Sequence, residues 1–421
     1  MKFVLASYGT RGDIEPSAVI ARELMRRGHE VLMAVPPDLV GFTEAAGLPT
    51  VPYGPNLQKM LDAYRDFWTC FFRNPWRIRE LVRLWRESWA PRTRSWGDMS
   101  RTLTSVTQGA DLLFTGLVFE EPAANVAEYY DIPLVTLHYV PVRINGQALP
   151  LPAPLTRTAM AVHEWLYWRV IKKAEDAQRA ELGLPKAKAP TPQRITERGS
   201  LEIQGYDDVF FPGLASEWAK WASQRPFVGA LTMELPTDAD EEVLSWIADG
   251  PPPIYFGFGS MAVDSPADTL AMISRVCAQL GERALICAGY TEFGDVAVHE
   301  HVKVVDAVNL AAIFPACRAV VHHGGAATTS VGLRAGAPTL ILSSDLSQSL
   351  WGGQVKKLKL GTARRFSAVT EESLMKDLRT ILAPEYAARA RTIATQMTPA
   401  TESVAAAADR MEQFARREYV R

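Results

Sequence analysis

The segment from Arg318 to Trp351, RAVVHHGGAATTSVGLRAGAPTLILSSDLSQSLW, constrains the fold more than any other part of the chain. Its apolar run at 319–321 predicts a short strand, and a polar turn with two glycines follows. A helix is expected to begin near Ala326, and a second apolar strand comes after that helix. A strand, a helix and another strand in this order form the repeating unit of α/β proteins, so we expect an α/β fold.

The same turn predicts a binding site for an anion. Gly324 and Gly325 let the backbone approach a ligand closely, and the helix start near Ala326 directs unpaired N–H groups at that ligand. His323 and Thr328 supply side-chain donors beside these amides. We expect the group to hold a diphosphate through the helix terminus, the imidazole and the hydroxyl, without a lysine or a metal ion.

Strands and helices alternate in both halves of the chain. The predicted strands cover residues 2–8, 30–36, 111–116, 133–138, 254–260, 283–289 and 302–307. The predicted helices cover residues 17–27, 123–130 and 266–280, and residues 9–16 are expected to form a turn. The arrangement resembles two facing Rossmann-like domains joined by a linker at 231–240, with substrates expected in the cleft between them.

Composition and charge exclude several classes of protein. The 45 basic and 47 acidic residues give a formal net charge of −2, which offers no support for a nucleic-acid partner. The four cysteines have no metal-binding spacing, and we expect Cys70, Cys277, Cys287 and Cys317 to be reduced, buried and cytosolic. No stretch approaches 18 apolar residues and the N-terminal apolar run is too short for a signal sequence, so an integral membrane protein is not expected.

Several motifs resemble the nucleotide-sugar site of family 1 glycosyltransferases of the GT-B fold. They are HHGG at 322–325, FGFGSM at 256–261 and a Gln-x-x-Trp that ends at Trp351. GTRGDIEP at 9–16 is similar to the bacterial branch that glycosylates glycopeptide antibiotics and mycobacterial glycolipids (glycopeptidolipids and phenolic glycolipids). The resemblance spans nearly the whole chain and implies four parts: an acceptor-binding domain at 1–230, the linker at 231–240, a nucleotide-sugar-binding domain at 241–400, and a helix at 401–421 that crosses back to the first domain.

The resemblance makes Asp13 the candidate catalytic base. An acceptor hydroxyl must lose a proton as it attacks the anomeric carbon, and partial burial would raise the pKa of an aspartate toward a useful value. On turn geometry alone, Asp13 is instead a cap for a helix that begins near Glu15-Pro16. Many relatives carry His at this position. Plant relatives pair it with an aspartate after the strand at 111–115, where this chain has Gly116, so Asp13 would act without a relay.

The resemblance also distributes roles on the donor side. His323, the hydroxyl of Thr328 and the amides of Gly325, Ala326 and Ala327 would hold the diphosphate, with Ser260 facing it. His322 is expected to be structural, and Gln348 to read the sugar. The relatives' aspartate before that glutamine is Ser347 here, so the sugar cannot be carried over, although Asp345 is a candidate substitute. The base should rest on 305–309, which includes Val308, and both dTDP and UDP remain open.

Other acidic motifs are expected to be structural. Asp238-Ala239-Asp240 matches the metal-binding DxD of another glycosyltransferase fold, yet it lies in the linker beside a helix start, and we expect no metal site or other cofactor. Glu120 and Glu121 precede Pro122 at a second helix start, where acidic residues are favourable. The paired carboxylates of a glycoside hydrolase are not evident.

Residues 67–96 combine tryptophan and arginine to an unusual degree. They hold five of the eleven tryptophans, and the nine arginines between Arg65 and Arg101 face only four acidic residues. After Pro75, apolar residues recur at helical spacing at Ile78, Leu81, Val82, Trp85 and Trp89. Such a helix suits an anionic membrane interface and an apolar acceptor lipid. The alternative is that this stripe packs in the core or lines the acceptor pocket.

These observations predict an inverting, metal-independent glycosyltransferase. It would move a hexose or 6-deoxyhexose from a dTDP- or UDP-sugar to a hydroxyl of a lipid-like natural product such as a cell-envelope glycolipid. The expected location is the cytoplasm, with peripheral contact at the inner face of the plasma membrane. Four alternatives remain open: a sterol glucosyltransferase, a small-aglycone glucosyltransferase, a sugar-nucleotide epimerase, and a scaffold with a degenerate donor site.

Overall fold

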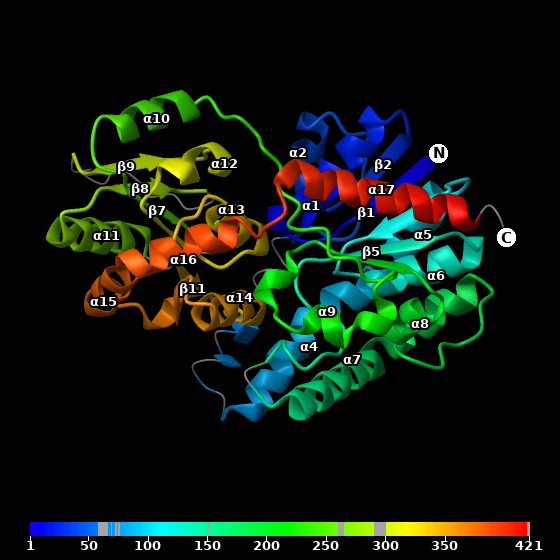
Figure 1. Ribbon diagram of the computed structural model, residues 1–421. Helices are drawn as coiled ribbons and strands as arrows, with labels where there is room; N and C mark the ends of the chain where they lie inside the picture. Colours follow the sequence, from blue (N-terminus) through cyan, green and yellow to red (C-terminus); the bar gives the residue numbers. More distant parts are fainter. Residues whose placement is uncertain are drawn as a thin grey trace. The chain divides into compact units, whose positions relative to one another are not determined.

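The computed structural model describes residues 1–57, 66–68, 70–71, 74, 76–149, 151–259, 265–289 and 300–418, with the backbone alone at 88–92 and 417–418. The chain forms two compact units (Figure 1). Unit 1 comprises Met1–Asp208, Pro212–Met233 and Ala400–Arg421, and unit 2 comprises Val209–Phe211 and Glu234–Pro399. The last stretch of the chain therefore belongs to the same unit as the first.

Unit 1 is built on a six-stranded sheet in which every pair of neighbouring strands is parallel, in the order β3-β2-β1-β4-β5-β6. Its strands are β1 (Lys2–Ala6), β2 (Glu30–Val35), β3 (Thr50–Pro52), β4 (Leu112–Thr115), β5 (Leu134–His138) and β6 (Leu201–Gln204). Each is short, and most are mainly apolar, as expected for strands of a parallel sheet that is covered on both faces; β6 differs because it carries the buried Glu202 and Gln204. This strand order is that of a Rossmann-like domain.

The described helices of unit 1 are α1 (Arg11–Arg26), α2 (Val40–Ala45), α4 (Ile78–Arg94), α5 (Trp96–Thr107), α6 (Glu120–Tyr130), α7 (Ala153–Glu181), α8 (Thr191–Glu197), α9 (Leu214–Glu217) and α17 (Ala400–Glu418), with short 3-10 turns at Pro37–Leu39 and Ala219–Trp221. A further 3-10 turn, Asp208–Phe210, begins in unit 1 and ends in unit 2. Most helices of unit 1 lie around this sheet, whereas α4 packs on α5, and α7 packs on α5 and α6 (Figure 1). The expected crossing of the C-terminal helix is confirmed, because α17 packs against α1. Arg27 bonds Asp409 at 2.6 Å, and His29 bonds Glu412 at 2.9 Å.

Unit 2 repeats the same architecture. Its parallel strands follow the order β12-β11-β10-β7-β8-β9. The strands are β7 (Ile254–Gly257), β8 (Ala284–Cys287), β9 (Val302–Val305), β10 (Ala319–His322), β11 (Thr339–Ser343) and β12 (Gly361–Arg365). The helices are α10 (Asp240–Ala248), α11 (Pro266–Leu280), α12 (Leu310–Ile313), α13 (Ala326–Arg334), α14 (Leu346–Lys357), α15 (Glu371–Ile381) and α16 (Pro384–Ala394), with 3-10 turns at Phe314–Ala316 and Phe366–Ala368.

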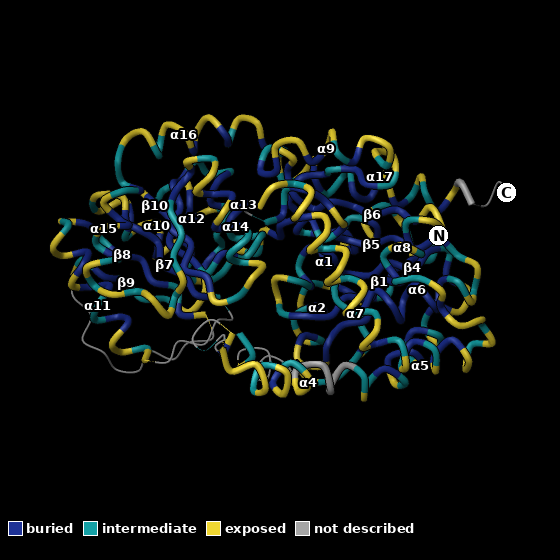
Figure 2. Tube along the Cα trace, turned by 90° about the horizontal axis from the view of Figure 1, so that it is seen from below, coloured by how far each residue is buried: buried dark blue, intermediate teal, exposed yellow. Residues whose placement is uncertain are grey.

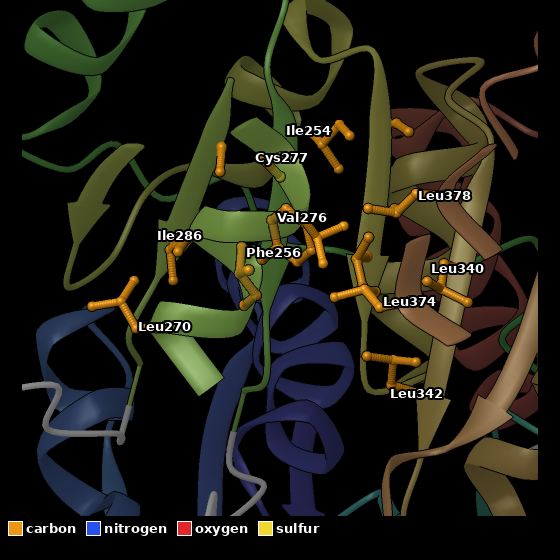
Figure 3. Packing of buried hydrophobic residues seen from close by; sticks show 14 of the residues in the cluster. Ile254, Phe256, Leu270, Val276, Cys277, Ile286, Leu340, Leu342, Leu374 and Leu378 are labelled. Atoms are coloured by element: carbon orange, nitrogen blue, oxygen red, sulfur yellow. The ribbon is translucent and has the colours of Figure 1, made fainter. Parts of the chain in front are cut away.

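One face of the unit 2 sheet carries a closely packed apolar core (Figure 3). Phe256 of β7 and Leu340 of β11 contribute from the sheet, while Val276 of α11 and Leu378 of α15 cover it, and none of the four side chains is exposed. This core holds β7 and β10 side by side. The turns that follow these two strands are thereby fixed on a rigid base.

The expected turn at 9–16 is wrong, because α1 already begins at Arg11. The glycines and Pro16 suggested a turn. However, Thr10 and Asp13 form a reciprocal capping box that starts the helix six residues earlier than expected, with Pro16 inside it. Asp13 is thus the third residue of a helix rather than a turn residue.

The four cysteines are free thiols, as expected. Cys70 and Cys277 are buried, whereas Cys287 and Cys317 are only partly buried, so the expectation of burial fails for the second pair. No helix in the described ranges has both the length and the apolar character needed to cross a bilayer.

Candidate active site

Both units present the carboxyl ends of parallel strands at a point where the strand order reverses, and ligands of doubly wound sheets bind at such points. In unit 2 this point lies between β7 and β10. The turn after β10 begins with His322, which is fully buried and accepts a hydrogen bond at Nδ1 from the amide of Gly324 at 2.9 Å. Burial holds the pKa of His322 well below its usual range. His322 therefore shapes the turn as a neutral residue.

The neighbouring His323 ring lies between two glycines. A Cβ atom at Gly259, after β7, or at Gly325 would come within 2.7 Å of the ring, so only glycine leaves room for it on either side. Burial lowers the pKa of His323 to about 4, and the imidazole is neutral near pH 7. Its Nδ1 atom has no hydrogen-bond partner among the described residues. The ring can therefore offer one N–H to a ligand.

Helix α13 begins directly after this ring. Gly325 is its extended N-cap residue, so Ala326, Ala327 and Thr328 form the first turn, whose N–H groups lack intrahelical acceptors. The hydroxyl of Thr329 turns inward and donates to the carbonyl of Gly325 at 2.8 Å, whereas Thr328 is partly exposed. The structure thus brings together the His323 ring, the Thr328 hydroxyl and the amides of Gly325, Ala326 and Ala327 on one turn, where they form a local positive potential suited to an anion.

Helix α14 supplies the residues expected to read the sugar. Asp345 caps this helix by accepting from the amide of Gln348 at 2.9 Å and from the hydroxyl of Ser347 at 2.9 Å. Burial raises the pKa of Asp345. The carboxamide oxygen of Gln348 is itself occupied by the amide of Ser344 at 2.7 Å. Ser347 therefore pairs with the very aspartate that was expected to substitute for the missing carboxylate.

The remaining donor-side residues divide into three cases. Val308 is 9% exposed and packs in an apolar cluster with Tyr255 and Leu285, so its side chain is mainly part of the core. Trp351 is buried, with the rings of Phe210 and Phe211 edge-on to it at 5.3 and 5.6 Å. This contact explains why residues 209–211 belong to unit 2. The predicted Ser260 lies outside the described residues.

In unit 1, the Asp13 carboxylate accepts hydrogen bonds from Thr10 and from Tyr139. The amide and hydroxyl of Thr10 donate to Oδ2 at 2.6 and 3.0 Å, and the hydroxyl of Tyr139 donates to Oδ1. A Cβ atom at Gly9 would overlap this carboxylate, and Gly9 has a φ of +138°, which side chains rarely adopt. The turn after β1 is therefore shaped around the Asp13 side chain, which both caps α1 and remains partly exposed.

Sequence reasoning missed Tyr139. It directly follows β5, and its contact with Asp13 spans 126 residues, so no local pattern links the two. The available signal was its position at the carboxyl end of a predicted parallel strand. This end lies at the same edge of the sheet as the end of β1, which is two strands away and leads to the candidate base. Tyr139 is not a carboxylate, so the expectation that Asp13 acts without a relay stays a prediction.

The two glutamates at the start of α6 have opposite environments. Glu120 accepts from both terminal nitrogens of Arg143 at 2.9 and 3.0 Å and lies 2.7 Å from Nε2 of His138. Although burial opposes it, these partners lower the pKa of Glu120 to about 2. Burial raises the pKa of Glu121 to about 7, and its Oε2 has no partner among the described residues. Both acids lie at a helix start, as expected, and each is only 5% exposed.

Replacing Glu121 by glutamine should flatten the pH dependence of stability. The folded chain keeps the Glu121 proton up to about pH 7, while the unfolded chain loses it near pH 4.5. The protonated Glu121 therefore contributes fully to the free energy of unfolding below pH 4.5, and this contribution is lost as pH rises through 7. This shift in the pKa of Glu121 corresponds to a change of about 3 kcal/mol in the free energy of unfolding between low and high pH. Thermal unfolding at pH 5 and pH 8 should show the variant gaining on the wild type at pH 8. The exposed Glu181→Gln is the control, and an identical pH slope in wild type and Glu121→Gln would contradict the assignment.

Asp240, the second acid of the expected linker, has a structural role at the start of α10. It accepts from the amide of Thr237 at 2.8 Å and from the amide of Asn309 at 2.8 Å. Within the described ranges, no group of three or more His, Cys, Asp or Glu side chains is arranged to hold a metal ion.

The fold and the donor turn define a class, the nucleotide-sugar-dependent glycosyltransferases with two Rossmann-like units. Comparison with known proteins agrees. Residues 3–96 match the glycosyltransferase family 28 N-terminal domain, and residues 288–411 match the erythromycin biosynthesis protein CIII-like C-terminal domain. The uncharacterized glycosyltransferase Rv1524 of Mycobacterium tuberculosis is 58% identical over 99% of this chain and 100% of its own length.

Solved structures show the same fold. The glycosyltransferase of kitacinnamycin has a TM-score of 0.72 and 17% identity, with 98% of each chain covered. The glycosyltransferase VinC in complex with DTDP has a TM-score of 0.64 and 19% identity, covering 99% of this chain and 100% of its own. The chain belongs to the family 1 glycosyltransferases of the GT-B fold, and it is an enzyme that uses a nucleotide-sugar donor.

Proposed function

We propose that this chain is an inverting, metal-independent hexosyltransferase that uses a dTDP- or UDP-sugar and glycosylates a hydroxyl on a lipid-like natural product. The observation that carries the donor assignment is the neutral, mostly enclosed His323 beside the first turn of α13. A dianionic diphosphate gains hydrogen bonds there from the imidazole, the Thr328 hydroxyl and backbone amides. DTDP in the related VinC supports the dTDP alternative.

The proposed reaction is a single displacement. The acceptor oxygen attacks the anomeric carbon as the bond from that carbon to the diphosphate oxygen breaks, and the acceptor proton passes to Asp13. The donor turn stabilises the charge that develops on the departing diphosphate. One displacement inverts the anomeric configuration. We assign Gln348 and the Asp345–Ser347 pair to the sugar hydroxyls, with Val308 near the base.

The lipid-like acceptor is supported by the surface of α4. Trp76, Ile78 and Val82 are 71%, 68% and 42% exposed, while Leu84 on another side of the helix is buried. The exposed residues alternate with Arg79, Arg83 and Arg86, which are exposed too. Figure 2 shows α4 largely in the colours of exposed and intermediate residues. Apolar side chains that stay in water among arginines suit an anionic membrane interface, so we place the enzyme at the inner face of the plasma membrane.

Thermal unfolding with dTDP, UDP and ADP tests the donor site. A ligand at 100 times its Kd adds about 2.7 kcal/mol of stability, which should raise the unfolding midpoint by a few degrees for dTDP or UDP but not for ADP. His323→Ala should lose roughly tenfold or more in affinity for the effective nucleotide, because one hydrogen bond to a charged group is removed. No shift with any nucleotide would favour a degenerate scaffold. Consumption of a sugar nucleotide without an acceptor would favour an epimerase.

A further inference from the structure

The long helix α7 carries an apolar surface that the site does not use. Leu155, Val162, Trp165, Leu166 and Val170 are between 37% and 58% exposed. Four of them, Leu155, Val162, Leu166 and Val170, recur at intervals of seven, four and four residues, which places them on one side of the helix. We call this side, together with Trp165, the α7 stripe. A contiguous apolar stripe on a helix in water marks a binding surface.

The far end of the same helix is firmly anchored, so the α7 stripe is not the result of a loosely placed helix. Gln178 accepts from the indole of Trp96 at 2.8 Å and from Asn125 at 2.9 Å. Arg179 bonds both carboxylate oxygens of Glu128 at 2.7 and 2.8 Å. The C-terminal half of α7 therefore packs in unit 1, while the N-terminal half extends along its margin (Figure 1).

Charge around the α7 stripe has one sign. Arg169 lies over the Trp165 ring at 5.7 Å, and Lys173 is exposed one turn beyond Leu166 and Val170 on the same side. Between residues 154 and 173 the single acidic residue is Glu164, nine positions from Leu155 and therefore on the opposite side of the helix. The α7 stripe is therefore bordered by Arg169 and Lys173. The aliphatic parts of these side chains can lie along lipid chains while their charged ends reach lipid phosphates.

We infer that the α7 stripe docks on an anionic lipid surface. Aliphatic and tryptophan side chains would enter the headgroup boundary, and Arg169 and Lys173 would pair with lipid phosphates. A second copy of the chain fits less well, because two α7 stripes facing each other would bring like charges together. The inference deepens the proposed lipid acceptor by adding a second membrane-contacting helix to α4, and its test does not require sugar transfer.

Co-sedimentation of the full chain with vesicles tests the inference. Vesicles of equal parts phosphatidylglycerol and phosphatidylcholine should bind the wild type, and pure phosphatidylcholine should bind it much more weakly. Val162→Ser/Leu166→Ser should weaken binding by on the order of a hundredfold, because two aliphatic side chains no longer leave water. Arg169→Gln/Lys173→Gln should weaken binding roughly thirtyfold and reduce its salt dependence.

The control is Met25→Ser/Leu244→Ser, which removes two exposed apolar side chains, 36% and 37% exposed, from α1 and α10 and should bind as the wild type does. All variants change exposed residues, and an unchanged unfolding midpoint verifies that each is folded. A wild type that ignores anionic vesicles, or α7 variants that bind as well as it does, would overturn the inference. A wild-type dimer that becomes monomeric in the serine variant would show that the occupant is a second copy.

Two further readouts separate this inference from the proposed function. The nucleotide-induced shift in unfolding midpoint should be the same in the α7 variants and the wild type, because the donor turn lies in unit 2. A chain that binds vesicles through the α7 stripe but transfers no sugar to any lipid would leave the docking surface standing and refute the acceptor. Transfer to lipid that is indifferent to the α7 variants would refute the docking surface and leave the acceptor standing.

Discussion

Replacing Asp13 by asparagine should lower the turnover number by about 10²- to 10⁴-fold, the usual contribution of a positioned general base. Nucleotide affinity should stay nearly unchanged, because the residues proposed to hold the diphosphate belong to unit 2, whereas Asp13 belongs to unit 1. The asparagine oxygen can still accept the Thr10 amide bond of 2.6 Å, so the start of α1 should survive. The loss would then reflect a missing proton acceptor and not a disrupted helix. Initial rates with saturating donor, together with the nucleotide-induced shift in unfolding midpoint, would measure both quantities.

Asp111 offers a matched control for this experiment. It accepts a backbone bond from the amide of Lys2 at 2.7 Å, as Asp13 does from Thr10, but it stands at the opposite, amino edge of the same sheet. Asp111→Asn should cost stability without a comparable loss of turnover. The turnover number of Tyr139→Phe should lie between those of Asp13→Asn and Asp111→Asn, because this change removes one donor to Asp13 and leaves the carboxylate in place. Equal loss of nucleotide binding and turnover in Asp13→Asn would contradict the assignment of the catalytic base to unit 1 and of the diphosphate site to unit 2.

The sequence predicted the donor turn well because its determinants are local. A strand, two glycines and a helix start fall within about ten consecutive residues, and the connection between β10 and α13 alone places His323 and Thr328 on one turn. The helix closed by Gly281 was predicted for the same reason, since an αL glycine ends a helix without reference to distant contacts. The start of α1 is also determined locally, by the capping box. The prediction failed because Pro16 is the sixth residue of the helix, beyond the first turn, where proline is normally disfavoured.

The contacts missed from the sequence are those that join distant segments. Tyr139 donates to Asp13, which lies 126 residues earlier in the sequence. Phe210 and Phe211 contact Trp351 from a three-residue segment that is flanked in the sequence by residues of unit 1. Helical periodicity could identify an apolar face on α4, yet it could not say that Leu84 turns inward while Ile78 and Val82 stay in water. Burial depends on what packs against a face, and that information is not local.

Replacing Gly324 by alanine should weaken nucleotide binding by about a hundredfold or more. Gly324 has a φ of +97°, which costs a side chain on the order of 1 to 3 kcal/mol. Its new Cβ would also lie 2.7 Å from Cγ2 of Ile341, a residue that is fully buried and has no room to withdraw. The turn must therefore move, and with it the His323 ring and the first amides of α13.

Gly353→Ala is the matched control for Gly324→Ala. Gly353 lies inside α14 of the same unit and does not have a positive φ, and a Cβ atom added there would meet no other group within 4 Å. Alanine there should raise stability by up to about 1 kcal/mol through helix propensity, with nucleotide affinity unchanged. Isothermal titration with the effective nucleotide measures both variants. Wild-type affinity in a folded Gly324→Ala would mean that the diphosphate does not sit on the turn between β10 and α13, and the donor assignment would have to be withdrawn.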